Sequence, residues 1–327
     1  MIYLGFDPGY GNTKLYGDDG GLVLPSHVAV KQNGRLTRME GMVRRRPPLA
    51  VTLAEHSFYV GGGAHDWGAP VESMDYTRLT GSPEVRATLY AALTEYQKQY
   101  GAITAPITLM VGLPQGALGS GRQVGAVKQW LLGDHRWRAG GEEQAVTIAE
   151  VLVTAQATGA LYDYVLDGDG RLHPERAGHM QQELGVVSLG FNTLELMVIR
   201  DRKPVERLTV GSKHGVRRLL QGMAHSASYS MGELDDRLRS GHVEEGARAL
   251  WLTHVVGQLE QAWGGDWRRF AQVVVVGGGA LLLRSELTAH FRGRCYLPDE
   301  PVLAVARGMW RMLRMRQLRM AQTGRAA

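Results

Sequence analysis

The sequence is poor in cysteine and has no long apolar run. Cys295 is the only cysteine among 327 residues, so an internal disulfide is excluded. No run reaches the roughly 18 apolar residues of a membrane helix, and residues 1–11 carry Asp7 and glycines where a signal peptide has a basic start and an apolar stretch. Cysteines and histidines are not grouped with zinc spacing, so we expect no structural metal. These absences predict a folded cytoplasmic protein.

Acidic residues are absent from the end of the sequence. Residues 305–327 hold six arginines and no Asp or Glu, while the whole chain has a formal net charge of +5, so the remainder carries −1. This distribution argues against a basic groove for nucleic acid across the body. We expect a helix from Pro301 to Met315 that docks its apolar side, followed by a loose basic tail. Contact of that tail with DNA or a membrane is the less favoured alternative.

Glycine, in contrast, is abundant, with 43 residues, which indicates many tight turns or close backbone approaches. Short runs rich in Val, Ile and Tyr predict strands, and longer segments of helical period lie between them. The expected strands are residues 2–6, 22–24, 107–111, 186–187, 194–199 and 273–276, and the expected helices are residues 83–100, 150–164, 215–223, 243–263 and 301–315. This alternation predicts α/β layering in about two domains.

One turn motif occurs twice. The first glycine turn, Asp7-Pro-Gly-Tyr-Gly-Asn-Thr-Lys14, is echoed by the second glycine turn, Ser188-Leu-Gly-Phe-Asn-Thr193. Each copy follows one predicted strand and precedes another, which is typical of a hairpin. The same hairpin opening two halves of the chain predicts two similar lobes with a boundary near residues 166–173, although two unrelated hairpin turns would give the same pattern.

The first glycine turn has the residue types of a phosphate-binding hairpin. Gly9 and Gly11 lack side chains, so backbone N–H groups can approach an anion, and Lys14 can neutralise a phosphate. Asp7 is an anion itself, so its natural partner is a hydrated Mg²⁺ between carboxylate and phosphate. An ordinary structural turn remains the alternative. The third glycine turn, Gly277-Gly-Gly279, ends a Val-rich strand and predicts either contact with a flat group such as adenosine or a sharp strand-to-helix turn. Gly61-Gly-Gly63 predicts a loop.

These three turns, in this order, resemble the motifs of the actin-like ATPases, which share a fold with sugar kinases and heat-shock chaperone ATPase domains. They are similar to the family's phosphate-1, phosphate-2 and adenosine motifs. Further segments resemble the branch of ParM-type plasmid-segregation proteins and archaeal actin relatives: Leu24-Pro-Ser-His-Val-Ala29, Val111-Gly-Leu-Pro114 and Pro301-Val-Leu-Ala-Val-Ala-Arg-Gly308. The resemblance extends from Ile2 to about Arg314.

The resemblance implies an α/β, actin-like two-lobed fold with a nucleotide cleft between the lobes. Each lobe would be a mixed five-stranded sheet flanked by helices. The first lobe would comprise residues 1–165 with 302–327 and a small subdomain at about 31–74. The second lobe would comprise residues 166–301 with a small subdomain at about 211–266.

The resemblance also assigns roles to residues of the three turns. Asp7 would hold Mg²⁺ through water, and Lys14 would reach the β- and γ-phosphates of ATP. The other expected nucleotide contacts are Gly9, Tyr10, Gly11, Asn12 and Thr13 in the first turn, Ser188, Gly190, Asn192 and Thr193 in the second, and Gly277, Gly278 and Gly279 in the third. Gln156 and Glu195 would orient the attacking water.

Ser188 departs from the family pattern, because an aspartate usually occupies its position. A serine hydroxyl can donate to phosphate, but it brings no charge to Mg²⁺ and is a poor base near pH 7. Hydrolysis is therefore less certain than binding, and Glu195 would supply the missing carboxylate. Alternatively, Glu195 faces solvent on an alternating strand, and Gln156 is a solvated helix residue.

The function implied by the resemblance is slow hydrolysis of Mg-ATP, with GTP as an open alternative, coupled to head-to-tail polymerisation. Filaments of this branch segregate plasmids, so a DNA-bound adaptor would be a partner. Two rival functions are a non-polymerising kinase for a small molecule and a nucleotide-sensing scaffold with little turnover. Polymerisation itself has no signature in the sequence and follows from analogy.

Overall fold

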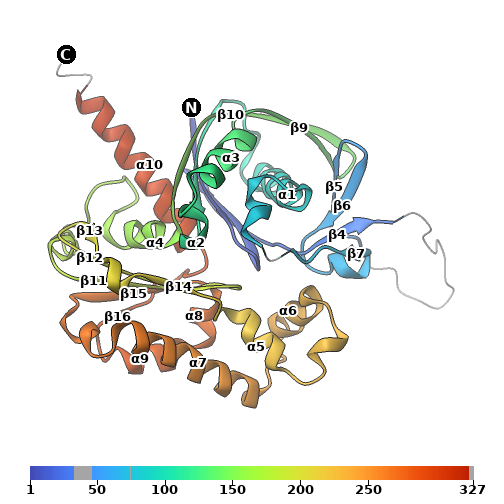
Figure 1. Ribbon diagram of the computed structural model, residues 1–327. Coiled ribbons are helices and arrows are strands. Elements are labelled where there is room, and N and C mark those ends of the chain that lie inside the picture. Colours follow the sequence, from blue (N-terminus) through green and yellow to red (C-terminus); the bar gives the residue numbers. More distant parts are fainter. Residues whose placement is uncertain (33–45, 74, 324–327) are drawn as a thin grey trace.

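Two mixed β-sheets and the helices around them make up the computed structural model, which describes residues 1–32, 46–73 and 75–323 (Figure 1). Residues 33–45 of the expected first small subdomain, and residues 324–327 of the expected tail, lie outside the described residues. The first sheet has ten strands in the order β3 (Gly20–Pro25), β2 (Asn12–Gly17), β1 (Ile2–Pro8), β8 (Ile107–Leu113), β10 (Glu142–Ala155), β9 (Gly133–Ala139), β5 (Leu49–Leu53), β6 (His56–Val60), β4 (Val28–Lys31) and β7 (Gly68–Pro70).

The second sheet has six strands. Their order is β13 (Lys203–Pro204), β12 (Leu194–Arg200), β11 (Leu184–Leu189), β15 (Gln272–Val276) and β16 (Cys295–Tyr296), and β14 (Val210–Ser212) also pairs with β12. In both sheets the first strand of a hairpin runs parallel to its other neighbour: β1 pairs antiparallel with β2 and parallel with β8, while β11 pairs antiparallel with β12 and parallel with β15. Both sheets are mixed, as expected, but they have ten and six strands in place of the expected five.

The helices form three layers that alternate with the two sheets (Figure 1). The outer face of the first sheet is covered by α1 (Pro83–Tyr100) and α3 (Gly121–Leu131), with the short α2 (Gln115–Leu118) beside them. Between the sheets lie α4 (Gln156–Val165) and α10 (Ala304–Thr323). The outer face of the second sheet is covered by α7 (Glu245–Trp263), α8 (Gly278–Leu282) and α9 (Arg284–His290). α5 (Val216–Gly222) packs on α7, and α6 (Met231–Arg239) packs on α5 and on the 3₁₀ helix of residues 64–66. This order brings the ends of β1 and β11 to the space between the sheets.

Glycines allow the middle layer to pack closely. A Cβ atom on Gly308 of α10 would lie 1.8 Å from the carbonyl oxygen of Gly159 in α4, and one on Gly5 of β1 would lie 2.0 Å from the carbonyl oxygen of Ala306. No side chain fits at these positions without moving backbone. An ion pair reinforces the packing, because the Arg307 guanidinium donates to both carboxylate oxygens of the buried Asp163 at 2.7 and 2.9 Å. The helix α10 is therefore fixed to the first sheet and to α4.

Two expected helix boundaries are wrong. Residues 150–155 belong to β10 and not to a helix, because this Val-rich segment pairs in parallel with β8, and the helix begins only at Gln156. The expected stop near Met315 is also incorrect: α10 continues to Thr323, and Arg316 pairs with Glu150 at 2.7 Å instead of starting a loose tail. Of the helices within the described ranges, none combines the length and the apolar character needed to cross a membrane.

Candidate functional site

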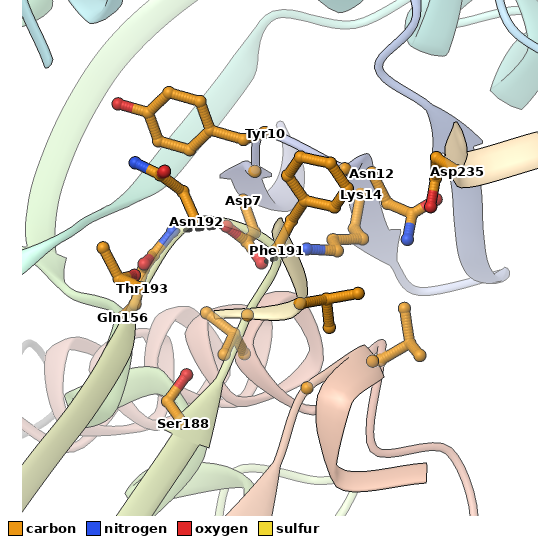
Figure 2. A pocket seen from close by; sticks show the side chains of 18 of the residues that line it. Asp7, Tyr10, Asn12, Lys14, Gln156, Ser188, Phe191, Asn192, Thr193 and Asp235 are labelled. Carbon is orange, nitrogen blue, oxygen red and sulfur yellow. Dashed lines mark hydrogen bonds and ion pairs between the residues drawn. The ribbon is translucent and has the colours of Figure 1, made fainter. Parts of the chain in front are cut away.

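Both glycine turns open into one cavity that lies between the two sheets (Figure 2). Its volume is about 250 Å³, and its mouth is open to solvent. This volume lies near the lower end of the roughly 300–1,000 Å³ that is typical of small-molecule sites, and the open mouth gives a nucleotide further space. The ends of β1 and β11 form its polar wall. The third glycine turn lies at the same cavity.

The first glycine turn is a tight cradle over a lysine. A Cβ atom on Gly9 would lie 2.5 Å from the carbonyl oxygen of Asn12 and 2.7 Å from Nζ of Lys14, so only glycine fits there. From beneath, the buried Arg78 stacks on the ring of Tyr10, 4.1 Å from its centroid, and its guanidinium points at the carbonyl oxygen of Gly9. Burial raises the pKa of Tyr10 to about 12, although Arg78 opposes the shift. Two cationic side chains thus support this turn.

Asp7 lies at the centre of the polar wall, and only 3% of it is exposed. Lys14 is its cross-strand neighbour and donates to Oδ2 at 2.9 Å, and Gln156 donates to Oδ1 at 2.7 Å from the start of α4 (Figure 2). Each carboxylate oxygen has two lone pairs, so one on each oxygen remains to accept from water. This donor set fits a Mg²⁺ ion that is held mainly by phosphates and reaches Asp7 through its water shell.

Gln156 is positioned by the junction of β10 and α4. It is the first residue of the helix and lines the cavity while its amide is bonded to Asp7. The alternative that it is a solvated helix residue is therefore incorrect. Its role in orienting water stays a prediction.

The second glycine turn faces the first across the cavity. Ser188, Gly190, Asn192 and Thr193 all line it, and the turn closes through a 2.9 Å bond from the N–H of Gly190 to the carbonyl oxygen of Thr193. The turns also touch each other, because a Cβ atom on Gly11 would lie 2.8 Å from the side chain of Phe191. The twin hairpins expected from the sequence repeat therefore meet at one place.

Glu195 lies behind the second glycine turn and not in solvent. It is the cross-strand partner of Ser188, only 2% of it is exposed, and Oε1 accepts from the backbone N–H of Gln115 at 3.0 Å. Its Oε2 is buried without a hydrogen-bond partner. Burial raises the pKa of Glu195 to about 7, the Gln115 N–H opposes this shift and the charge of Asp7 adds to it. The alternative of a solvent-facing residue is wrong, and a carboxyl that titrates near pH 7 can hold or release a proton.

The third glycine turn begins the apolar wall of the cavity. Gly277 has a φ of 99°, a left-handed conformation that favours glycine, and its N–H donates to the carbonyl oxygen of Pro301 at 2.8 Å. The apolar residues of this wall come from α5, α6, α8 and the segment before α10: Val216, Leu238, Leu281, Leu282 and Val302. Leu281 is 46% exposed, so a flat apolar group would find partners here.

Most of the expected contacts line the cavity, and three do not. Thr13 is buried and its hydroxyl bonds to that of Ser26 at 2.9 Å. Gly279 packs against Leu189, to which a Cβ atom on this glycine would come within 2.5 Å. Glu195 lies behind the wall, next to Ser188. The nucleotide roles of all three remain predictions, and those of Thr13 and Gly279 could involve only their backbone.

Ten of the residues that line the cavity were not expected from the sequence, among them Phe191, Asp235 and Arg239. Phe191 belongs to the second glycine turn, but its side chain has no polar atom. Only the glycine and the polar residues of that turn were therefore predicted to contact the nucleotide. Asp235 and Arg239 reach the cavity from α6; Arg239 points at the carbonyl oxygen of Gly11 at 3.3 Å and bonds to Asp235 at 2.8 Å. The sequence analysis did not predict α6, and the spacing of four residues between Asp235 and Arg239 was the one available signal.

Comparisons with known proteins agree with this geometry. A family model described as the actin-like proteins N-terminal domain matches residues 5–159. No curated protein matches the chain. Several solved structures match it over nearly the full length of both chains.

Three of these structures are informative. The crystal structure of apo ParM of pSK41 has a TM-score of 0.74 at 14% identity and covers 98% of this chain and 99% of its own. An archaeal actin homolog in complex with ADP has a TM-score of 0.72 at 20% identity, with coverage of 96% and 99%. A 15-stranded ParM filament from Clostridium botulinum has a TM-score of 0.69 at 16% identity, with coverage of 95% and 98%. The chain therefore has the actin-like fold, and its residues 5–159 match the model of the actin-like proteins N-terminal domain.

Proposed function

We propose that the protein binds Mg-ATP in the cavity between its sheets, hydrolyses it slowly and forms nucleotide-dependent filaments. One observation carries the proposal: glycine turns from both sheets meet at a single cavity that contains Asp7, Lys14 and Gln156. An ADP complex of an archaeal actin homolog with the same fold supports the nucleotide. The proposed lobes are residues 1–165 with 302–327 and residues 166–301.

The charges on the polar wall suit a triphosphate. Lys14 would move from Asp7 to the β- and γ-phosphates, and Arg78 would add positive potential from beneath the first glycine turn. Mg²⁺ would neutralise phosphate charge, and Asp7 would accept hydrogen bonds from its water shell. The apolar wall would pack against the base of the nucleotide. Such apolar contacts do not distinguish adenine from guanine, so polar residues at the mouth of the cavity would select the base. Gln156 would orient a water molecule for attack on the γ-phosphate.

Hydrolysis depends on how Ser188 and Glu195 share a task that the family usually gives to an aspartate. Ser188 reaches the cavity but is uncharged at neutral pH, whereas Glu195 can ionise but lies behind the wall. This arrangement favours slow turnover. It also favours a second candidate function, a nucleotide-sensing scaffold with little turnover.

Filament formation is supported by the likeness to a ParM filament, in which chains of the same fold assemble. We propose a head-to-tail contact between copies of this chain, because a repeated non-closing contact produces a filament. Plasmid or DNA segregation in the cytoplasm, with a DNA-bound adaptor as partner, is the cellular role that we propose for such a filament.

Calorimetry with Mg-ATP, Mg-ADP and Mg-GTP tests the binding step. We expect Lys14→Ala to weaken ATP binding by about 10- to 150-fold, since a hydrogen bond to a charged group contributes roughly 1.5–3 kcal/mol. The exposed Lys128 on α3 provides the control, and Lys128→Ala should bind like the wild type. Equal affinity of wild type and Lys14→Ala, or no uptake of any nucleotide by folded protein, would refute the proposal.

Phosphate release, light scattering and electron microscopy distinguish the candidate functions. Turnover accompanied by scattering and by filaments in Mg-ATP supports the proposed function. Turnover that needs an added small molecule and gives no filaments indicates a kinase. Binding with negligible turnover and no filaments indicates the scaffold.

A further inference from the structure

A cluster of two histidines and one aspartate lies beside the nucleotide cavity, and none of the three lines that cavity. His27 lies between β3 and β4, His65 lies in the short 3₁₀ helix of residues 64–66, and Asp236 lies on α6. One nitrogen or oxygen atom of each residue lies within 4.8 Å of the others. The cluster therefore joins two segments of the first sheet's region to a helix of the second (Figure 1).

His27 has the setting of a metal ligand. Its Nε2 lies 2.8 Å from Oδ2 of Asp235, and because an ionised carboxylate only accepts, Nε2 carries the proton. The lone pair is then on Nδ1, which is buried without a hydrogen-bond partner. The His27 side chain is only 8% exposed, so water does not easily replace that partner. A carboxylate that orients the far side of an imidazole is the usual support of a ligating histidine.

Asp236 and His65 complete a set of donors around the Nδ1 of His27. Oδ1 of Asp236 lies 3.5 Å from that nitrogen, which is too long for a hydrogen bond. It is close to the roughly 3.3 Å that separates neighbouring ligands of a tetrahedral zinc ion with bonds of about 2.0–2.1 Å. His65 is 10% exposed, its Nε2 lies 3.8 Å from Oδ2 of Asp236, and its Nδ1 is also buried without a partner.

The surroundings leave room for an ion and hold its carboxylate in place. A cavity of about 40 Å³ is lined by His27 and His65 but not by Asp236, and its volume exceeds the roughly 10–15 Å³ that one water molecule needs. The backbone N–H of Gly63 donates to Oδ2 of Asp236 at 2.8 Å. This bond gives the Gly61-Gly-Gly63 loop an acidic partner that the sequence did not reveal.

We propose that His27, His65 and Asp236 bind one Zn²⁺ ion and that this ion joins the two sides of the cleft. Two imidazoles and one carboxylate are a donor set that suits zinc, with a water molecule in the fourth position. Our expectation of no structural metal rested on spacing along the chain, whereas folding assembles this set from three distant segments. The site does not depend on the proposed nucleotide function.

The ion would also influence the nucleotide cavity, and this consequence alone rests on the proposed function. Asp235 and Arg239 belong to α6, as does Asp236, and both line that cavity. Zinc would fix α6 against the first glycine turn, so zinc and nucleotide should each tighten binding of the other by the same factor.

The test uses tag-free full-length protein that has been stripped with a chelator and contains no nucleotide. We expect isothermal titration with ZnCl₂ to give one ion per chain with micromolar or lower Kd. His65→Asn and Asp236→Asn should weaken binding at least tenfold, and Asp235→Asn by about 10- to 100-fold through loss of imidazole orientation. The exposed His56 on β6 supplies the matched control, and His56→Asn should bind zinc like the wild type.

Two further measurements test the coordination of the ion and its independence from nucleotide binding. Co²⁺ bound in place of Zn²⁺ should give the intense visible absorption of a four-coordinate ion, and the His65→Asn variant should lose it while its circular dichroism is unchanged. The Lys14→Ala variant should retain zinc even where it has lost nucleotide, which separates the two proposals. Absence of zinc uptake by folded wild type, or equal uptake by His65→Asn and Asp236→Asn, would mean that the cluster is only a set of ion pairs and would overturn the proposal.

Discussion

Replacing Glu195 by glutamine removes a buried carboxyl whose pKa is raised from 4.5 to about 7. Between these two values the folded protein holds a proton on Glu195 that the unfolded chain has released, so the free energy of unfolding falls as pH rises. One pKa unit corresponds to 1.36 kcal/mol, so the wild type loses about 3 kcal/mol from this residue between pH 4.5 and pH 8. Glu195→Gln avoids that loss, since glutamine does not ionise.

Urea unfolding of both proteins at several pH values measures this difference. We expect the stability of Glu195→Gln minus that of the wild type to rise by about 3 kcal/mol between pH 4.5 and pH 8. Any loss of stability caused by the new amide is independent of pH, so it shifts the stability difference equally at every pH. Glu143, whose side chain is 77% exposed, provides the control, and the difference for Glu143→Gln should vary far less. A flat curve for Glu195→Gln would refute the raised pKa and, with it, the idea that Glu195 titrates near neutral pH.

Two further predictions concern the middle helix layer. Gly308→Ala should lower the free energy of unfolding by about 1–3 kcal/mol, because its Cβ would collide with the backbone of α4, whereas Gly257→Ala on the exposed side of α7 should raise it by about 0.5–1 kcal/mol. Thermal or urea unfolding checks both, and a stable Gly308→Ala variant would contradict the close packing. Asp163→Ala should cost about 3–5 kcal/mol, since it removes the buried carboxylate that Arg307 and Arg311 share and leaves Arg307 only the exposed Glu300. The double variant Asp163→Leu with Arg307→Met should recover part of this loss, because Arg311 still loses its contact with Asp163, and no recovery would show that the pair with Arg307 is not the cause.

The sequence predicted the parts of the fold whose physical causes are local. The helix of residues 83–100 has the same bounds in the structure, because Pro83 begins it and Gly101 ends it. The twin glycine turns were also recognisable, since their conformations require particular residues. The β9–β10 hairpin was missed because its strands carry charged residues on their exposed face, and the Val-rich end of β10 has a spacing that also fits a helix.

In the candidate site, too, the sequence predicted residues of local motifs but not residues that only the tertiary structure brings together. Asp7, Lys14 and Gln156 were predicted, the first two from the turn and the third from the family resemblance, and the structure brings them into direct contact. The burial of Glu195 could not be predicted, because the second face of β12 is covered by segments that are distant in the chain. The same reason hid the group of His27, His65 and Asp236.

The apolar layer formed by α4 and α10 is shared by both sheets, with Met110 of the first and Val186, Met197 and Val274 of the second packed against it. Separating the two sheets at this layer would expose apolar side chains to water. A rotation of one sheet relative to the other would therefore use the α4–α10 layer as its hinge. The separation would then be largest near α6, which lies on the side of the molecule away from α10 (Figure 1) and whose Asp235 is bonded to His27 at 2.8 Å. A fluorophore attached beside that contact would therefore be the most sensitive reporter of how far the two sides of the nucleotide cavity have separated.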